Sequence, residues 1–147
     1  MSVCFLSFAA IQAEEKPLSR ALNPVPRNDA WWRDKQETNR VRIEKGGVDL
    51  LLVGDSIVGS LDGAGRKVQD YYYGDRNFVN MGFGGDRTQH VLWRLDHLPM
   101  GKIQPKAVML LIGSNNLSDR ETTDPLCIVL QIALLKNWGR SQGNKAK

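Results

Sequence analysis

Three short apolar runs, separated by stretches with helical patterns, most constrain what this chain can fold into. The runs span residues 48–54, 77–81 and 107–112, and the first is apolar enough to be buried on both faces, as parallel strands are. Between them, residues 88–98 carry apolar side chains at helical spacing, and residues 57–73 are expected to contain a helix that is interrupted near Gly63 and Gly65. This alternation of strand and helix predicts an α/β fold with a doubly wound parallel sheet.

Polar residues follow each apolar run at the point where a strand would end. Gly54-Asp55-Ser56 follows the first run, residues 82–86 (GFGGD) follow the second, and residues 113–116 (GSNN) follow the third. Ligands bind outside the carboxyl ends of parallel strands, so these three places are expected to converge. A serine nucleophile needs a positioned base and hydrogen-bond donors for the developing oxyanion. Ser56 is the candidate nucleophile, and the candidate donors are the N–H groups of Ser56 and Gly85 and the side-chain amide of Asn115.

Four blocks of the sequence resemble a known family. They are LLVGDSI (51–57), NMGFGGDRTQHVLWRL (80–95), IQPKAVMLLIGSNN (103–116) and, more weakly, NPVPRNDAWW (23–32). These blocks are similar to the SGNH (GDSL-type) hydrolase superfamily. Within it they are most similar to the catalytic-subunit type of platelet-activating-factor acetylhydrolase Ib and its bacterial relatives.

The resemblance implies a fold, a reaction and a set of site residues. The fold is a flavodoxin-like three-layer α/β/α domain with a five-stranded parallel sheet. Ser56 matches the family nucleophile, and Gly85 and Asn115 match its oxyanion-hole residues. Family members deacylate small-molecule esters, often removing acetyl groups from lipids or carbohydrates, without a metal or an organic cofactor.

The sequence departs from the family after Asn116. The family's base and its orienting acid lie in a late Asp-x-x-His block, which this sequence lacks, and no histidine follows His97. A truncated or frame-shifted reading would explain this, so we expect an incomplete sheet whose third strand exposes an apolar edge, and little or no esterase activity. His90 is expected to be held by local hydrogen bonds on a helix, where Asp86 could contact it, rather than to act as the base. His97, beside Asp96, is expected to be solvated.

The remaining segments suggest how the chain is organised. Residues 1–13 have the apolar stretch and small final residues of a secretory signal, although no Lys or Arg precedes them, and they predict export to the periplasm or outside the cell. Residues 14–29 are expected to form an extended arm that Trp31 and Trp32 pack onto the domain, with a substrate lid as the alternative. Residues 30–138 are expected to form one partial domain, ending in an apolar helix at 124–138, and residues 139–147 a disordered basic tail.

Composition excludes several classes of function. The net charge of +4 equals the four cations in residues 136–147, a segment that contains no acidic residue, so the rest of the chain is near neutral. No basic face for nucleic acid is predicted. Neither of the two cysteines has metal-ligand spacing with a histidine, and no apolar run is long enough to span a bilayer. The alternative to an esterase is a non-catalytic α/β module that binds acylated sugars or lipids, or a partner through residues 126–138.

Overall fold

The computed structural model describes residues 20–118 of the 147-residue chain. The strands are β1 (Leu50–Gly54), β2 (Phe78–Gly82) and β3 (Ala107–Leu111); the α-helices are α1 (Ala30–Glu44), α2 (Ser56–Gly59), α3 (Arg66–Tyr73), α4 (Thr88–Asp96) and α5 (Ser114–Ser118); the short 3-10 helices are η1 (Arg20–Leu22), η2 (Ser60–Asp62) and η3 (Met100–Lys102). The predicted signal segment, apolar helix and basic tail lie outside the described residues.

The three strands form one parallel sheet in the order β2-β1-β3. Every residue of the central strand β1 is buried, as its continuous apolar sequence predicts. The register pairs Gly54 at the end of β1 with Gly82 of β2 and Leu111 of β3, so all three carboxyl ends meet at one edge of the sheet. This order begins the 2-1-3 arrangement of flavodoxin-like folds, and the predicted α/β class is confirmed.

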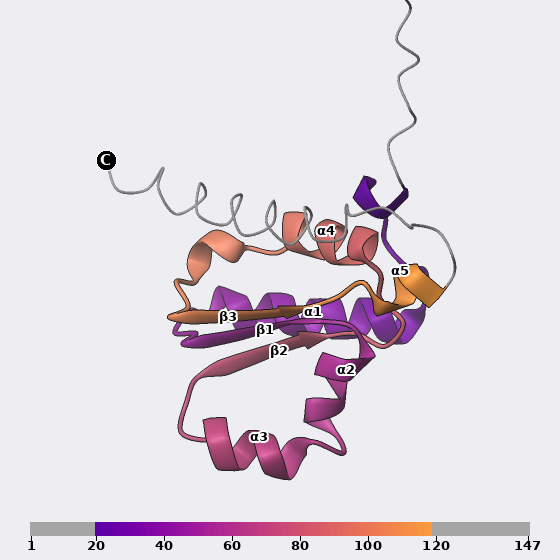
Figure 1. Ribbon diagram of the computed structural model, residues 1–147. Helices are drawn as coiled ribbons and strands as arrows, with labels where there is room; N and C mark the ends of the chain where they lie inside the picture. The colour runs from indigo at the N-terminus through magenta and orange to yellow at the C-terminus, as the bar shows by residue number, and fades with distance from the viewer. Residues whose placement is uncertain (1–19, 119–147) are drawn as a thin grey trace, which may run out of the picture.

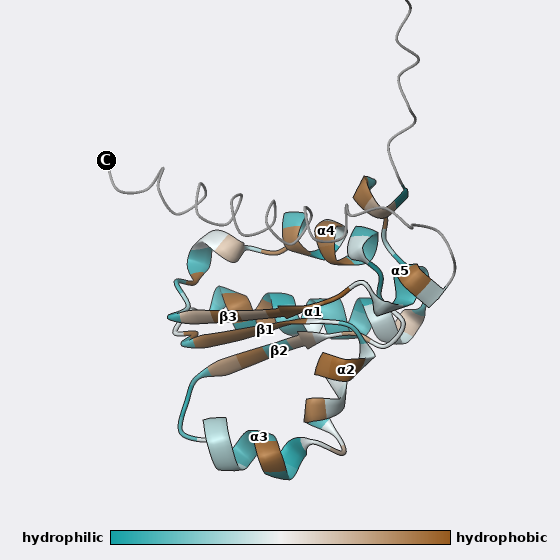
Figure 2. Ribbon diagram, viewed as in Figure 1, coloured by the Kyte–Doolittle hydropathy of each residue, from teal (hydrophilic) through white to brown (hydrophobic). Residues whose placement is uncertain are grey.

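Helices cover both faces of the sheet, and the strand side chains alternate between two apolar clusters. In Figure 1, α4 and α3 lie at opposite ends of the view with the sheet between them. The strands are largely hydrophobic along their length, whereas α1 alternates between hydrophobic and hydrophilic residues (Figure 2). The larger cluster joins the strands to α1 and α4 and contains Ile43, Val48, Leu51, Val53, Val79, Met81, Val91, Leu98, Met100, Ile103 and Ile112. The smaller cluster, on the α2 side, contains Leu50, Leu52 and Val58.

Helix α1 buries one stripe of its surface, because its buried residues recur every three or four positions. These residues are Trp32, Gln36, Asn39 and Ile43. The helix ends at Glu44, and the chain turns toward β1 through Gly46 and Gly47, both with positive φ. Glycine with positive φ is a common end of an α-helix, so the two glycines account for where α1 stops. Within residues 20–118, no helix is long and apolar enough to cross a membrane.

Residues 57–73 form three short pieces, α2, η2 and α3, rather than one helix. The break falls near Gly63 and Gly65, as expected from the sequence. Helix α3 buries only Gln69 and leaves Val68, Tyr71 and Tyr72 exposed. Residues 20–29, expected to be extended, include the 3-10 turn η1, whose Ala21 is buried and whose carbonyl accepts a hydrogen bond from Thr88 Oγ1.

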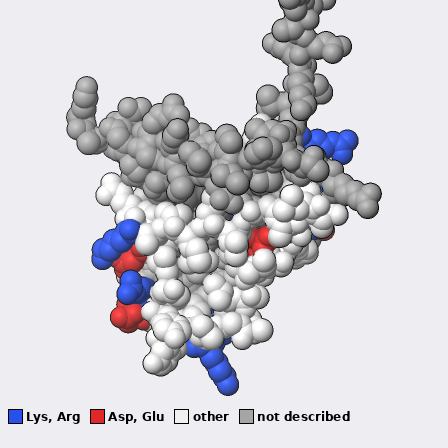
Figure 3. All heavy atoms as spheres, viewed as in Figure 1, with Lys and Arg blue, Asp and Glu red and all other residues white. Residues whose placement is uncertain are grey.

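Strand β3 has one neighbouring strand among the described residues, and this edge strand exposes apolar side chains on one of its faces. Its alternate residues Ala107, Met109 and Leu111 are exposed, with Met109 40% and Leu111 45% accessible. On the surface seen in Figure 3, the charged side chains lie mostly toward the margins and much of the area between them is uncharged. An apolar strand edge is a template for pairing with another chain.

Self-association of the chain is expected to fall when a lysine is placed on this edge. Met109→Lys should raise the fraction that elutes as monomer in size-exclusion chromatography at equal concentration, because a charge on an edge strand opposes pairing. Met109→Lys should change the free energy of unfolding by no more than about 0.5 kcal/mol, because Met109 is exposed. The matched control is Val68→Lys, which charges an exposed residue of α3 (56% accessible) away from the sheet edge. A sharp monomer peak for the unaltered chain would contradict the prediction.

Candidate active site

Ser56 lies two residues after the end of β1 and is the exposed first residue of α2. Asp55 precedes it and is fully buried. One carboxylate oxygen of Asp55 accepts the backbone N–H of Ile57 at 2.9 Å, which caps α2. The other accepts the hydroxyl of Ser114 at 2.5 Å. Asp55 therefore fixes the start of α2 and ties it to the end of β3, while the Ser56 side chain faces solvent.

The loop after β2 begins with a tight turn over residues 83–86. The N–H of Phe83 donates to the carbonyl of Gly54 at 3.1 Å, and the N–H of Asp86 donates to the carbonyl of Phe83 at 3.1 Å. Gly85, the third residue of this turn, has φ +73°. A positive φ at the third position is typical of a type II turn and favours glycine there. Gly84 and Gly85 are both exposed.

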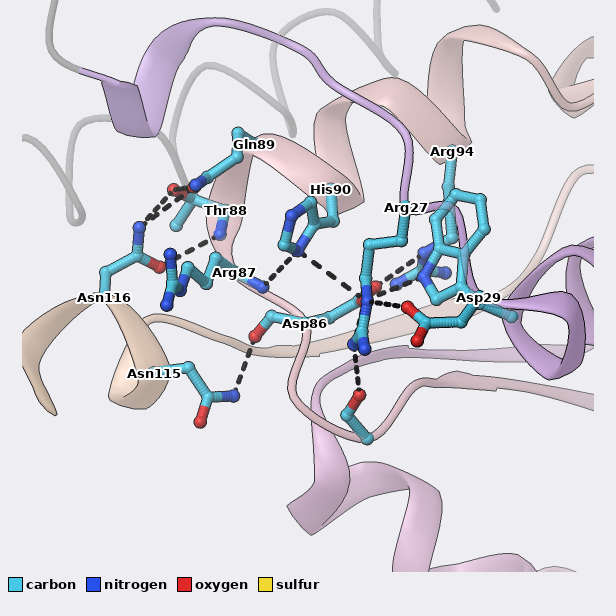
Figure 4. Close-up of polar contacts among 12 residues, drawn as sticks. Arg27, Asp29, Asp86, Arg87, Thr88, Gln89, His90, Arg94, Asn115 and Asn116 are labelled. Carbon is cyan, nitrogen blue, oxygen red and sulfur yellow. Dashed lines mark hydrogen bonds and ion pairs between the residues drawn. The ribbon is translucent and has the colours of Figure 1, made fainter. Parts of the chain in front are cut away.

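Two asparagines of α5 contact the start of α4 and the loop before it (Figure 4). The side-chain amide of Asn115 donates to the backbone carbonyl of Asp86 at 2.8 Å. Asn116 is fully buried and accepts the N–H of Thr88 at 3.0 Å, and its amide lies 3.1 Å from Gln89 Oε1. The end of β3 is thus held against the end of β2 through side-chain amides.

The neighbours of the three predicted site residues contact one another. Asp55, beside Ser56, binds Ser114, which precedes Asn115. Asn115 itself binds Asp86, which follows Gly85. The structure thus brings the three predicted segments to one edge of the sheet, as the parallel topology requires.

A fully buried ion pair lies behind this edge. Arg94 Nε donates to Asp86 Oδ2 at 2.9 Å, and the Trp32 indole N–H donates to Asp86 Oδ1 at 2.8 Å. Arg94 also reaches the carbonyls of Met81 and Gly54, at 3.2 and 3.4 Å. Burial raises the pKa of Asp86 above its usual value, although Arg94 and Trp32 act to lower it. Burial also lowers the pKa of Arg94 to about 10.

This buried network was missed in the sequence analysis. The feature of the sequence that indicates this network is the position of Arg94. It lies three residues after Val91 and four before Leu98, among the apolar residues that α4 and the residues after it bury. A charged residue on a buried stripe requires a partner. Asp86, which follows the Gly-Gly pair, is the first acidic residue that precedes Arg94 in the sequence.

The two histidines have structural partners. His90 Nδ1 accepts the backbone N–H of Arg87 at 3.0 Å and lies 3.7 Å from Asp86 Oδ1, so the predicted local hydrogen bond and the predicted contact with Asp86 are both present. His97 is exposed, but it is not merely solvated as predicted. Its ring stacks on Trp93 with centroids 3.9 Å apart, and its Nδ1 lies 2.8 Å from the Trp93 carbonyl oxygen.

Comparison with known proteins gives relatives among the subunits of platelet-activating factor acetylhydrolase IB. No protein-family model matches the chain. The human platelet-activating factor acetylhydrolase IB subunit alpha2 is 37% identical over 73 residues, which cover 46% of this chain and 29% of that subunit. The human subunit alpha1 is 29% identical over 110 residues, covering 72% of this chain and 46% of that subunit. The alpha1 subunit of Rattus norvegicus is 36% identical over 70 residues. The matches span less than half the length of these relatives.

The prediction of export is wrong, because these relatives are intracellular subunits and point against an exported protein. The physical reason lies in the first 13 residues. An apolar stretch with small residues at its end is only part of a secretory signal, and the positively charged region that should precede it is absent.

The relatives agree with the resemblance carried by residues 51–57, 80–95 and 103–116. They are acetylhydrolases, which are ester hydrolases. Their identity of 29–37% extends over parts of the chain only. Over part of its length, the chain is therefore similar to the alpha subunits of platelet-activating factor acetylhydrolase IB.

Proposed function

We propose that this chain carries the nucleophile and the oxyanion-binding half of a serine ester hydrolase. The observation that carries the proposal is the pair of hydrogen bonds that join Asp55 to Ser114 and Asn115 to Asp86. Together they hold the segments of Ser56, Gly85 and Asn115 at one edge of the sheet. The relation to acetylhydrolases supports the same reaction class.

In this proposal Ser56 Oγ attacks the ester carbonyl, and three donors stabilise the negative oxygen that develops. The donors are the N–H groups of Ser56 and Gly85 and the amide of Asn115. The Asn115 amide carries two N–H groups. One donates to the Asp86 carbonyl, which orients the amide plane, and we assign the other to the oxyanion. Donors fixed before the reaction stabilise the transition state without reorganising.

The substrate we propose is a small acyl ester, of which an acetyl ester of a lipid or a carbohydrate is the simplest case. The exposed position of Ser56 leaves the alcohol part of the ester room outside the turn. The step that this sequence does not supply is activation of Ser56, because it has no Asp-x-x-His block. In subtilisin, loss of the nucleophile or the base costs about 10⁶ in kcat, and about 10³–10⁴ over water remains.

The chain alone is therefore expected to hydrolyse p-nitrophenyl acetate at close to the background rate, and added imidazole should restore part of the activity by acting as the missing base. The restored rate should be larger for the unaltered chain than for Ser56→Ala, and it should fall in Asn115→Ala. Mass spectrometry should detect an acetyl group on Ser56. Asn23→Ala, in the exposed arm, is the matched control for the amide substitution.

Equal imidazole-dependent rates in the unaltered chain and Ser56→Ala, with no acetyl adduct, would contradict the proposal. Saturable binding of an acetyl ester without acetylation of Ser56 would instead favour the non-catalytic binding module. Hydrolysis without imidazole that vanishes in Ser56→Ala would show that a base is present in the chain. His90→Ala would then test the one histidine near the site.

A further inference from the structure

The peptide unit between Gly84 and Gly85 carries the N–H group that the proposed function assigns to the oxyanion. It is the central peptide of the turn over residues 83–86, which is closed by the hydrogen bond from Asp86 N–H to the Phe83 carbonyl. A trans peptide directs its carbonyl and its N–H to opposite sides. Whatever holds the Gly84 carbonyl therefore also sets the direction of the Gly85 N–H.

Arg27, from the segment before α1, holds that carbonyl. Its Nη1 donates to the Gly84 oxygen at 2.6 Å, a short, charge-assisted hydrogen bond. The guanidinium is fixed from other sides as well: its Nε donates to Asp29 at 2.9 Å, it lies over the Trp31 ring at 5.2 Å, and its Nη1 is 3.7 Å from Asp86 Oδ1. Figure 4 shows Arg27 between Asp29 and the loop. Its side chain is 22% exposed, so the cation is only partly screened by solvent.

The backbone of this turn by itself allows two orientations of the central peptide. Type I and type II turns differ mainly by a rotation of the central peptide through about 180°, and a type II turn needs glycine at its third position. Both residues of this peptide are glycine, which reaches either conformation readily. A rotated peptide would turn the Gly84 carbonyl, rather than the Gly85 N–H, toward the oxyanion. The φ of +73° at Gly85 corresponds to the type II form of the turn.

We propose that Arg27 is a positioning residue of the oxyanion site, which locks the Gly84–Gly85 peptide through the Gly84 carbonyl and so directs the Gly85 N–H toward the substrate. A cation bound to the carbonyl also polarises the peptide, which strengthens its N–H as a donor. This inference rests on the proposed function only in assigning the Gly85 N–H to the oxyanion. The orientation of the peptide can be measured independently of any activity.

The test compares Arg27→Met with Arg33→Met by NMR. Arg33 is an exposed arginine of α1 that donates to Asn28, not to the loop. Arg27→Met is expected to change the residual dipolar coupling of the Gly85 N–H bond and the carbonyl shift of Gly84, whereas Arg33→Met leaves both unchanged. Acetate, used as the oxyanion probe, should shift Ser56, Gly85 and the Asn115 amide in the unaltered chain. Its affinity should fall about tenfold in Arg27→Met.

Arg27→Lys keeps the charge but not the planar fork, so it should retain part of the acetate affinity. It also serves as the second variant if Arg27→Met does not fold. An unchanged Gly85 N–H coupling in Arg27→Met, or in Arg27→Lys where only that variant folds, would overturn the inference. If acetate fails to shift these groups in the unaltered chain, the proposed function fails, and the coupling still decides the role of Arg27.

Discussion

Trp32→Ala is expected to lower the free energy of unfolding by about 3–5 kcal/mol or more, the range found when a buried aromatic residue is truncated. Trp32 is completely buried, and its ring contacts those of Phe83 and Trp93, with centroids 5.7 and 5.5 Å away. Its indole N–H also donates to the buried carboxylate of Asp86. Truncation therefore leaves a cavity and removes one donor from a buried charge, which adds to the loss. Urea denaturation followed by circular dichroism would measure the change.

The adjacent tryptophan is the matched control. Trp31 is 47% exposed and its ring lies 6.4 Å from that of Phe83, so Trp31→Ala should cost much less. Trp32→Phe keeps most of the ring packing but removes the N–H. Its loss in free energy of unfolding should lie between those of the two alanine variants, at about 1.5–3 kcal/mol, which is typical of a hydrogen bond to a charged group. Equal losses in Trp31→Ala and Trp32→Ala would show that neither the burial of Trp32 nor its bond to Asp86 stabilises the fold.

The arrangement of the sheet could be predicted from the sequence because its signals are local and agree with one another. The apolar runs of β1, β2 and β3 and the glycines before and after them fix where strands begin and end. Parallel topology then places their carboxyl ends at one edge, which is why the sequence alone predicts that Ser56, Gly85 and Asn115 lie near one another.

The contacts that hold these residues could not be predicted, because they join side chains far apart in the sequence. Arg27 and Gly84 are 57 residues apart, and Trp32 and Asp86 are 54 apart. No periodicity links such pairs. The sequence suggested that the tryptophans pack the arm, but the specific bond from Trp32 to Asp86 depends on how α1 lies against the loop. The wrong prediction of export has a different cause, since it rested on an incomplete match to a local pattern.

Gly82→Ala is expected to be the most disruptive single-methyl substitution in the described chain, because the added Cβ would meet backbone that cannot rotate away. It would lie 2.1 Å from the Gly59 nitrogen and 2.5 Å from the Val58 carbonyl carbon. Both atoms belong to α2, whose first residue is Ser56, so β2 and α2 must separate. Overpacking costs about 1–3 kcal/mol where side chains can adjust, and more where they cannot. We expect a loss above about 3 kcal/mol in urea denaturation.

A methyl group two residues later provides the control. Gly84 has open space around its Cβ position and its φ is not positive, so Gly84→Ala should change stability by no more than about 0.5 kcal/mol. Because the Gly82 clash displaces α2 from the sheet, Gly82→Ala should also shift the Ser56 amide in NMR spectra while the variant remains folded. Gly84→Ala should leave that amide in place. A Gly82→Ala protein as stable as Gly84→Ala would mean that α2 does not pack on β2 at this distance, and the edge that brings Ser56 to the Gly85 loop would lose its support.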